Sequence, residues 1–219
     1  HSKAHRGEVS RTIKYTGGPI KERNVRAAAI LVSVIFHPLL LTTYLVLVLG
    51  IFFPSLLMIA PQNLRVMTAF IFCFTFLLPV VNLIMFRMFG TISSYTLENR
   101  AERVIPFVAI TLIYLVTAFL FFFKLRFSTN FSFLLLIVSV LVLTAVVLNF
   151  FLKISVHALA AWGGVGILLP LNKAIEQPDL LWPTAGAILI TGFIMAARLY
   201  LNAHTPREIL VGSVSGFII

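Results

Sequence analysis

The sequence predicts an all-α integral membrane protein, a bundle of about six to seven transmembrane helices. Hydrophobic residues make up 60% of the 219 residues and charged residues 11%, whereas soluble domains average about 45–50% apolar and about 25% charged residues. The mean hydropathy is +1.04. Because a spanning helix needs roughly 20 residues, the chain has room for this number of helices in one membrane domain.

The chain divides into a basic N-terminal tail, residues 1–26, and a single transmembrane domain, residues 27–219. The tail carries seven Lys and Arg residues against two Glu residues, which predicts a segment that is flexible or lies on the membrane surface. The net charge of +10 would also suit nucleic acid. The basic residues gather in the tail and at helix ends, however, so we expect membrane lipids as their partners and no nucleic acid.

The composition offers few ligands for a metal ion or a redox cofactor. Cys73 is the single cysteine, which excludes an intrachain disulfide and a cysteine metal site. Asp179 is the single aspartate, and no acidic cluster suits Mg²⁺. We therefore expect neither a metal nor another cofactor. The first apolar run is too long and starts too late for a cleavable signal sequence.

The first four apolar runs predict spans at residues 27–53, 66–88, 104–123 and 131–152. His37-Pro38 falls inside the first, where proline frees a carbonyl and bends the helix. We interpret His37 as a hydrogen-bonded interior histidine rather than a ligand. Pro79 and Asn82 lie in the second span and are expected to face other helices.

Three further spans follow, at residues 153–170, 180–201 and 206–219. The fifth begins with Lys153-Ile-Ser-Val-His157 and contains Gly163-Gly164-Val-Gly166. The seventh begins at Pro206 and is still apolar at Ile219. Glycines in the fifth and seventh spans, Gly212 and Gly216 among them, suit close helix packing.

Polar clusters lie at the ends of these spans, at Arg100 and Arg103, at His157, and at Arg198 and His204. Two crossings separate each cluster from the next, so all of them and the tail share one membrane face. On this assignment 13 of the 17 Lys and Arg residues lie on that face, and the positive-inside rule makes it cytoplasmic.

The cluster from Arg198 to Glu208 suits histidine-based phosphoryl transfer. Glu208 lies one helical turn beyond His204, and an imidazole is a competent nucleophile when a carboxylate fixes its tautomer. His157 can act as an acid. Guanidinium groups suit the charge of a phosphoryl transition state.

These residues resemble the three motifs of the type 2 phosphatidic acid phosphatase (PAP2) superfamily of membrane lipid phosphatases. The third motif, Ser-Arg-x5-His-x3-Asp, matches Ala197-Arg198-x5-His204-x3-Glu208. The second, Pro-Ser-Gly-His, matches Ile154-Ser-Val-His157 in part. The first, Lys-x6-Arg-Pro, corresponds to Arg100-Ala-Glu-Arg103-Val-Ile-Pro106, with Thr96 at the lysine position. His37-Pro38-Leu with Thr43-Tyr44 also looks like the first helix of a PAP2-like group of small membrane proteins from Bacteroidetes.

The resemblance implies a PAP2-like bundle in a bacterial inner (cytoplasmic) membrane and a lipid phosphate substrate: phosphatidic acid, a related phospholipid phosphate or a polyprenyl phosphate or diphosphate. It implies that His204 attacks phosphorus and forms a phosphohistidine, that Glu208 orients it, and that His157 protonates the leaving alkoxide. The phosphoryl-binding residues that it implies are Arg198, Arg103, Arg100 and Ser155.

Each residue also has a structural interpretation. Glu208 can complete a capping box with Thr205 as N-cap, Ser155 can cap a helix, and Arg198 can extend to the lipid headgroups. His157 can be an interfacial histidine. The two remaining arginines, Arg100 and Arg103, can pair with Glu98, Glu102 or lipid.

Alternative functions stay open at this point. A catalytically degenerate PAP2-fold subunit or lipid-binding scaffold of a larger membrane complex would explain Thr96 in place of lysine and Val156 in place of glycine. The chain could also form a homo-oligomer. A b-haem or quinone redox subunit would use His37, His157 and His204. Transport or lipid flipping is a further alternative, although no charged residue marks a pathway through the spans.

Overall fold

The computed structural model describes residues 20–95, 97, 99–174 and 180–219, and within them every regular element is helical. The first half of the chain contains α1 (Ile20–Ile35), α2 (Pro38–Phe52), α3 (Pro54–Leu57), η1 (Pro61–Asn63), α4 (Leu64–Phe72), η2 (Cys73–Leu77), α5 (Leu78–Met88) and η3 (Ala101–Arg103). The second half contains α6 (Val104–Phe119), η4 (Leu120–Lys124), α7 (Thr129–Asn149), α8 (Val156–Ala174), α9 (Leu181–Tyr200) and α10 (Pro206–Ile218). The elements η1 and η3 are 3₁₀ turns, and η2 and η4 are π-helical turns.

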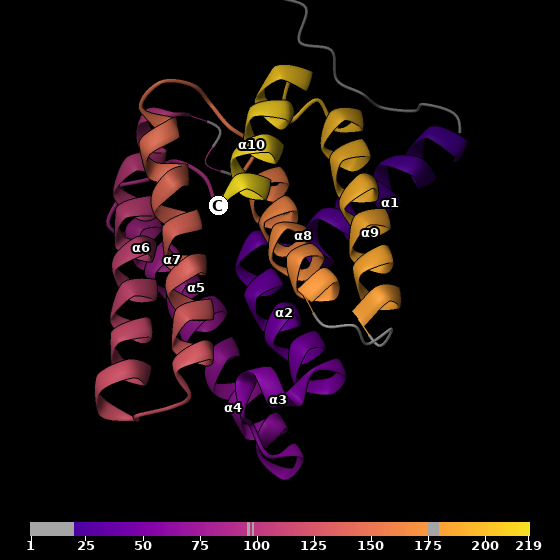
Figure 1. Cartoon of the computed structure of the whole chain (residues 1–219). Coiled ribbons are helices and arrows are strands. Elements are labelled where there is room, and N and C mark those ends of the chain that lie inside the picture. The colour runs from indigo at the N-terminus through magenta and orange to yellow at the C-terminus, as the bar shows by residue number, and fades with distance from the viewer. Residues whose placement is uncertain (1–19, 96, 98, 175–179) are drawn as a thin grey trace, which may run out of the picture.

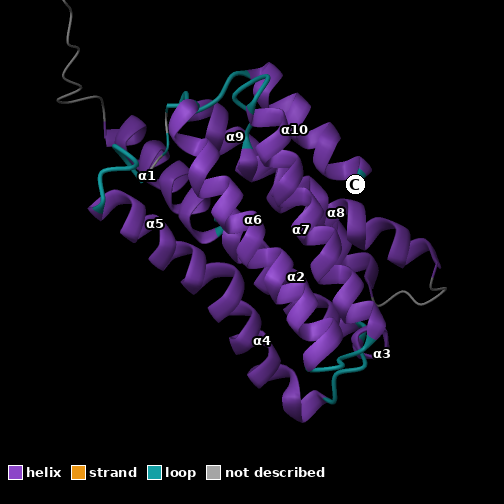
Figure 2. Ribbon diagram, turned by 90° about the vertical axis from the view of Figure 1, so that its left-hand side faces the viewer, coloured by secondary structure: helices purple, strands orange, loops and turns teal. Residues whose placement is uncertain are grey.

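The helices form one bundle in which α8 is central (Figure 1). Helix α8 packs against α2, α7, α9 and α10, while α6 pairs with α7, and α1 lies along α9. From the side, α4 and α5 continue one another along one edge of the bundle (Figure 2). The polar clusters predicted at the ends of the spans lie in or next to the turns that precede α6, α8 and α10.

Large apolar side chains cover the outside of the bundle. Val116, Leu189 and Phe193 are about two-thirds exposed, at 65%, 66% and 66%, and extensive apolar surface of this kind is typical of contact with lipid or with another protein. Several buried hydroxyls are satisfied within their own helices: Ser139 and Thr117 donate to the carbonyl oxygens of Leu135 and Ile113. The structure is therefore an integral membrane helical bundle, as the composition predicts.

Among the described residues, four helical segments are long and apolar enough to cross a membrane: Pro61–Met88, Ala101–Lys124, Thr129–Asn149 and Leu181–Tyr200. A fifth is reached if α1 and α2 count as one broken span. The predicted fifth and seventh spans are helical and correspond to α8 and α10, and the last turn of α8 contains the polar residues Asn172 and Lys173. Neither helix is among the four or five candidate spans of the described residues, compared with the six to seven spans predicted.

The first predicted span is broken rather than bent. Helices α1 and α2 meet at an angle of 63°, because Pro38 begins a new helix at its first position with His37 as its N-cap. Side chains from elsewhere bind the carbonyl oxygens that α1 leaves free at its end. The hydroxyl of Tyr44 donates to Ile35, and His157 lies 3.1 Å from the oxygen of Ser33. Helix α1 begins at Ile20, so residues 20–26 are helical; the remainder of the predicted tail lies outside the described residues.

The second proline-containing span is a continuous helix with a π-helical turn. Pro79 has no N–H, so the carbonyl oxygen of Thr75 lacks its usual helical donor. The buried hydroxyl of Tyr114 in α6 donates to that oxygen at 2.8 Å. This bond ties α6 to the irregular turn of the neighbouring span.

Glycines let α10 approach α8 closely. A methyl group on Gly212 would lie 2.7 Å from the carbonyl oxygen of Ser155, and one on Gly166 would lie 2.7 Å from that of Phe217. A methyl group on Gly216 would overlap the carbonyl of Leu159. This contact confirms the close packing predicted from the glycines and places the start of α10 beside the start of α8.

Candidate active site

The turn between α9 and α10 explains the five-residue spacing of Arg198 and His204. Asn202 adopts a left-handed conformation with φ 51°. The N–H of Ala203 donates to the carbonyl of Arg198, and the N–H of Asn202 to that of Leu199. This pair of bonds is the Schellman motif that ends a helix. It ends α9 and reverses the direction of the chain, so that Arg198 lies in the last turn of α9 and His204 lies in the connection to α10.

Helix α10 begins with a capping box that also involves the histidine. The hydroxyl of Thr205 accepts the N–H of Glu208, and the Glu208 carboxylate accepts the N–H of Thr205. The same carboxylate oxygen, Oε2, lies 2.8 Å from Nδ1 of His204. The two interpretations of Glu208, capping and orienting, therefore coexist.

His204 is held as a neutral imidazole. Its side chain is 4% exposed, and this burial lowers its pKa, an effect strengthened by Arg198 and Arg103 and opposed by Glu208. A neutral ring that donates its Nδ1–H to a carboxylate has its lone pair on Nε2. Nε2 is therefore the nitrogen available as a nucleophile.

Arg103, which immediately precedes α6, connects that helix by hydrogen bonds to the region around His204. The residue is 6% exposed; its Nε donates to the carbonyl of Leu97 at 2.6 Å and its Nη1 to the carbonyl of Ile154 at 3.2 Å. The N–H of Ser155 donates to the carbonyl of Glu208 at 3.3 Å. The segment just before α8 thus lies between Arg103 and the start of α10.

Arg198 has a buried donor without a partner. Its Nε is inaccessible to solvent and makes no hydrogen bond within the described residues. Buried donors are normally satisfied, and an exception calls for an explanation. A bound anion would supply the missing acceptor.

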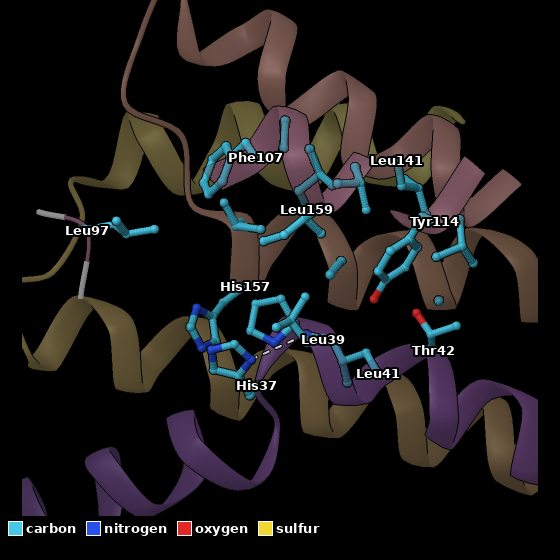
Figure 3. A pocket seen from close by; sticks show the side chains of 18 of the residues that line it. His37, Leu39, Leu41, Thr42, Leu97, Phe107, Tyr114, Leu141, His157 and Leu159 are labelled. Carbon is cyan, nitrogen blue, oxygen red and sulfur yellow. Dashed lines mark hydrogen bonds between the residues drawn. The ribbon is translucent and has the colours of Figure 1, made fainter. Parts of the chain in front are cut away.

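One cavity of about 180 Å³ collects these side chains. Arg103, His157, Arg198 and His204 line it, together with His37. The predicted common pocket is therefore present. The rest of the wall is mainly aliphatic and aromatic, and it extends from the histidines to Tyr114 and Thr42 (Figure 3).

The C-terminal third of the chain, residues 148–219, matches the family model of the PAP2 superfamily. This part of the chain is similar to the PAP2 superfamily. No curated protein and no solved structure matches it significantly.

The PAP2 match covers α8, α9 and α10, and with them His157, Arg198, His204 and Glu208. The segment that resembles the first PAP2 motif lies outside it. The structure nevertheless brings Arg103 of that segment to the other motifs, through its bond to Ile154. Thr96, at the position of the motif's lysine, lies outside the described residues, as does Glu98.

Two predicted phosphate-binding residues, Arg100 and Ser155, make hydrogen bonds that support the fold. Arg100 is exposed and donates to the carbonyl oxygens of Phe151 and Phe150, at 2.9 and 3.2 Å. It does not line the cavity, because it caps the end of α7. Ser155 is fully buried, and its hydroxyl accepts the N–H of Ala158, so it caps α8, the alternative weighed for it above.

Within the described residues, Arg100 and Arg103 form no ion pair with Glu102, one of the partners predicted for them. Glu102 binds the backbone N–H and hydroxyl of Ser93. Among the described residues, the one ion pair within 4.0 Å joins His204 and Glu208. The described residues contain no group of three His, Cys, Asp or Glu side chains arranged to hold a metal.

His37 is the cavity residue that sequence reasoning left aside. Its ring centre lies 5.7 Å from that of His157, at an angle of 77°. The only local signal was its position before Pro38, which predicted a bend in the first span but not a site. Edge contact between these rings leaves no space for a porphyrin between them, which argues against a haem held by this pair.

Proposed function

We propose that the protein is a lipid phosphatase that removes a phosphoryl group through a phosphohistidine at His204. The observation that carries this proposal is the combination found in one cavity: a carboxylate-bound histidine, an arginine with an unsatisfied buried donor, and an apolar wall. The similarity of residues 148–219 to the PAP2 superfamily supports the same class of reaction.

The first step is attack by Nε2 of His204 on phosphorus. A bond forms between this nitrogen and phosphorus, and the bond between phosphorus and the lipid oxygen breaks. Arg198 and Arg103 hold the phosphoryl oxygens, whose charge increases in the transition state. Glu208 keeps the imidazole oriented and stabilises the positive charge that develops on it.

The second step is hydrolysis of the phosphohistidine. Water attacks phosphorus, the phosphorus–nitrogen bond breaks, and inorganic phosphate leaves with His204 restored to its neutral form. With an alkoxide leaving group, His157 would have to supply a proton in the first step and recover it from the attacking water in the second.

The apolar wall supports a lipid rather than a soluble phosphate ester. Beyond the histidines the cavity is lined by residues such as Leu45, Ile110 and Leu141. An acyl or prenyl chain would bury apolar surface there, at about 0.8 kcal/mol per methylene group. A water-soluble sugar phosphate would leave its hydroxyls without partners.

The alternative of a non-catalytic subunit or scaffold is less well supported, because it does not require the pairing of His204 with Glu208. Phosphate release from a panel of lipid phosphates by wild type and His204→Ala discriminates between the two. We expect release by wild type, unaffected by EDTA, and a loss of about 10⁶-fold in the variant. Equal rates in the two proteins would end the catalytic proposal.

We further propose that the site faces the cytoplasm of a bacterial inner membrane. The proposal rests on the excess of Lys and Arg residues on the site face. With Cys73 replaced, a reporter cysteine in the N-terminal tail should resist an impermeant thiol reagent added to intact cells. Labelling from outside would reverse the orientation.

A further inference from the structure

His37 and His157 form a contacting pair at the polar end of the cavity. Figure 3 shows the two rings side by side, with Thr42 and Tyr114 at the other end of the apolar wall. His37 comes from the break between α1 and α2 and His157 from the first turn of α8. The pair therefore lies where the leaving group of a bound lipid phosphate would pass from the phosphoryl group into the apolar cavity.

Hydrogen bonds to the backbone determine the tautomer of each ring. Nε2 of His157 lies 3.1 Å from the carbonyl oxygen of Ser33. Since a carbonyl oxygen only accepts, Nε2 carries the proton and the neutral ring has a lone pair on Nδ1. Nδ1 of His37 accepts the N–H of Leu39 at 3.4 Å, so a neutral His37 carries its proton on Nε2. Within the described residues, this His37 N–H is the one ring donor of the pair that the backbone does not use.

The tautomers of His37 and His157 determine which leaving groups the site can stabilise. An alkoxide must be protonated as it leaves, so a neutral His157 would first need a second proton, on Nδ1. The resulting imidazolium would lie among apolar walls and close to Arg198, which disfavours a second positive charge. A phosphate leaving group requires hydrogen-bond donors but no proton, because it is stable as an anion.

On the basis of the proposed phosphatase function, we propose that His37 is a substrate-binding residue and that the site takes a lipid diphosphate in preference to a lipid monoester. The Nε2–H of His37 donates to the phosphate that stays on the lipid. Arg198 and Arg103 hold the terminal phosphoryl group that His204 attacks.

The bonds and charges of this reaction balance without an acid. A bond forms between Nε2 of His204 and the terminal phosphorus, and the bond from that phosphorus to the bridging oxygen breaks. The electron pair stays on the bridging oxygen, which leaves as part of the lipid monophosphate. Water then hydrolyses the phosphohistidine to inorganic phosphate.

The test variant is His37→Ser, which keeps a strong N-cap for α2 and removes the ring donor. Ser128→Ala is the matched control, because it removes the N-cap of α7 away from the cavity. Farnesyl diphosphate and farnesyl phosphate share one tail and differ only in the second phosphate. Purified full-length protein is assayed for phosphate release from each.

We expect wild type to favour the diphosphate in kcat/KM by at least about tenfold, the effect of one hydrogen bond to a charged group. His37→Ser should lose about 10- to 100-fold on the diphosphate and less than about threefold on the monophosphate. Ser128→Ala should leave unchanged the ratio of kcat/KM for the diphosphate to kcat/KM for the monophosphate. His37→Asn, which keeps both a cap and an N–H donor, should recover part of the preference.

Binding measurements separate this inference from the phosphatase proposal. His204→Ala should bind farnesyl diphosphate more tightly than farnesyl phosphate by calorimetry, and the double variant with His37→Ser should lose that advantage. No turnover by wild type, with the binding preference retained, would overturn the phosphatase proposal and leave the role of His37 standing. Equal losses on both substrates in His37→Ser, or equal affinities in His204→Ala, would overturn the role of His37 alone.

Discussion

Oε2 of Glu208 lies 2.8 Å from Nδ1 of His204 and 3.3 Å from the backbone nitrogen of Thr205. One carboxylate oxygen thus orients the proposed nucleophile and caps the helix that follows it. The capping box and the histidine–carboxylate pair share a single side chain, so a substitution at Glu208 can be chosen to separate the two roles.

Glu208→Gln should reduce activity far more than stability. The glutamine oxygen can still accept the N–H of Thr205, but it carries no charge to stabilise the imidazolium-like state of His204. We expect kcat to fall by about 10²- to 10⁴-fold, less than in His204→Ala. The thermal midpoint in detergent should change little. A large drop in that midpoint would show that the carboxylate is chiefly structural.

Arg198→Ala should abolish phosphate binding without destabilising the fold. The Nε of Arg198 has no hydrogen-bond partner among the described residues, so truncation breaks no bond of the resting protein. We expect kcat/KM to fall by about 10²- to 10³-fold. Inorganic phosphate should raise the thermal midpoint of wild type but not of the variant; stabilisation of both would place the anion elsewhere.

Alanine substitutions of Arg103, Arg100 and Arg198 should differ in their effects on activity and stability. Arg103→Ala breaks bonds to the carbonyls of Leu97 and Ile154, so it should lower both activity and stability, the latter by about 1–3 kcal/mol. Arg100→Ala should lower stability alone, because Arg100 binds the end of α7 outside the cavity. A loss of activity in Arg100→Ala as large as that in Arg198→Ala would contradict this division.

The pH dependence of kcat/KM should show a neutral nucleophile. Burial lowers the pKa of His204 below the ordinary value of 6.5. Its neutral form therefore persists below that pH, and activity should decline only as pH falls through the lowered pKa. Since Glu208 acts to raise this pKa, Glu208→Gln should move the acid limb to still lower pH. Ionisation of the substrate affects wild type and Glu208→Gln equally. An acid limb at the same pH in both proteins would therefore contradict the assignment of that limb to His204.

Gly212→Ala should disturb the site through packing. The new methyl group would lie 2.7 Å from the carbonyl oxygen of Ser155, pushing α10 and Glu208 away from α8. We expect a loss of about 1–3 kcal/mol in stability and reduced activity. Gly192→Ala is the control, because a methyl group there meets nothing within 4 Å. It should be neutral or slightly stabilising.

The predictable part of the site is the part fixed by local sequence. Arg198, His204 and Glu208 are set by a helix end, a left-handed turn at Asn202 and a capping box, all within eleven residues. The glycines of α8 and α10 likewise predicted their close contact. Composition alone predicted a helical membrane protein.

The features that could not be predicted depend on contacts with residues elsewhere in the chain. Pro38 indicated a bend, but the full break depends on Tyr44 and His157, whose side chains bind the last carbonyls of α1. His37 became a cavity residue only because His157, far along the chain, lies against it. Arg100 and Arg103 are three residues apart, yet the backbone carbonyls that each one binds give them different roles.

The most direct test of the central claim is to trap the phosphoenzyme. Wild-type protein is mixed with lipid diphosphate or phosphatidic acid in the presence of EDTA, quenched in alkali, digested, and analysed by mass spectrometry. The account predicts an alkali-stable, acid-labile phosphate on His204, absent from His204→Ala and accumulating in Glu208→Gln only if hydrolysis slows more than attack. Phosphate release by wild type with no phosphate on His204, or with phosphate on another residue, would contradict it.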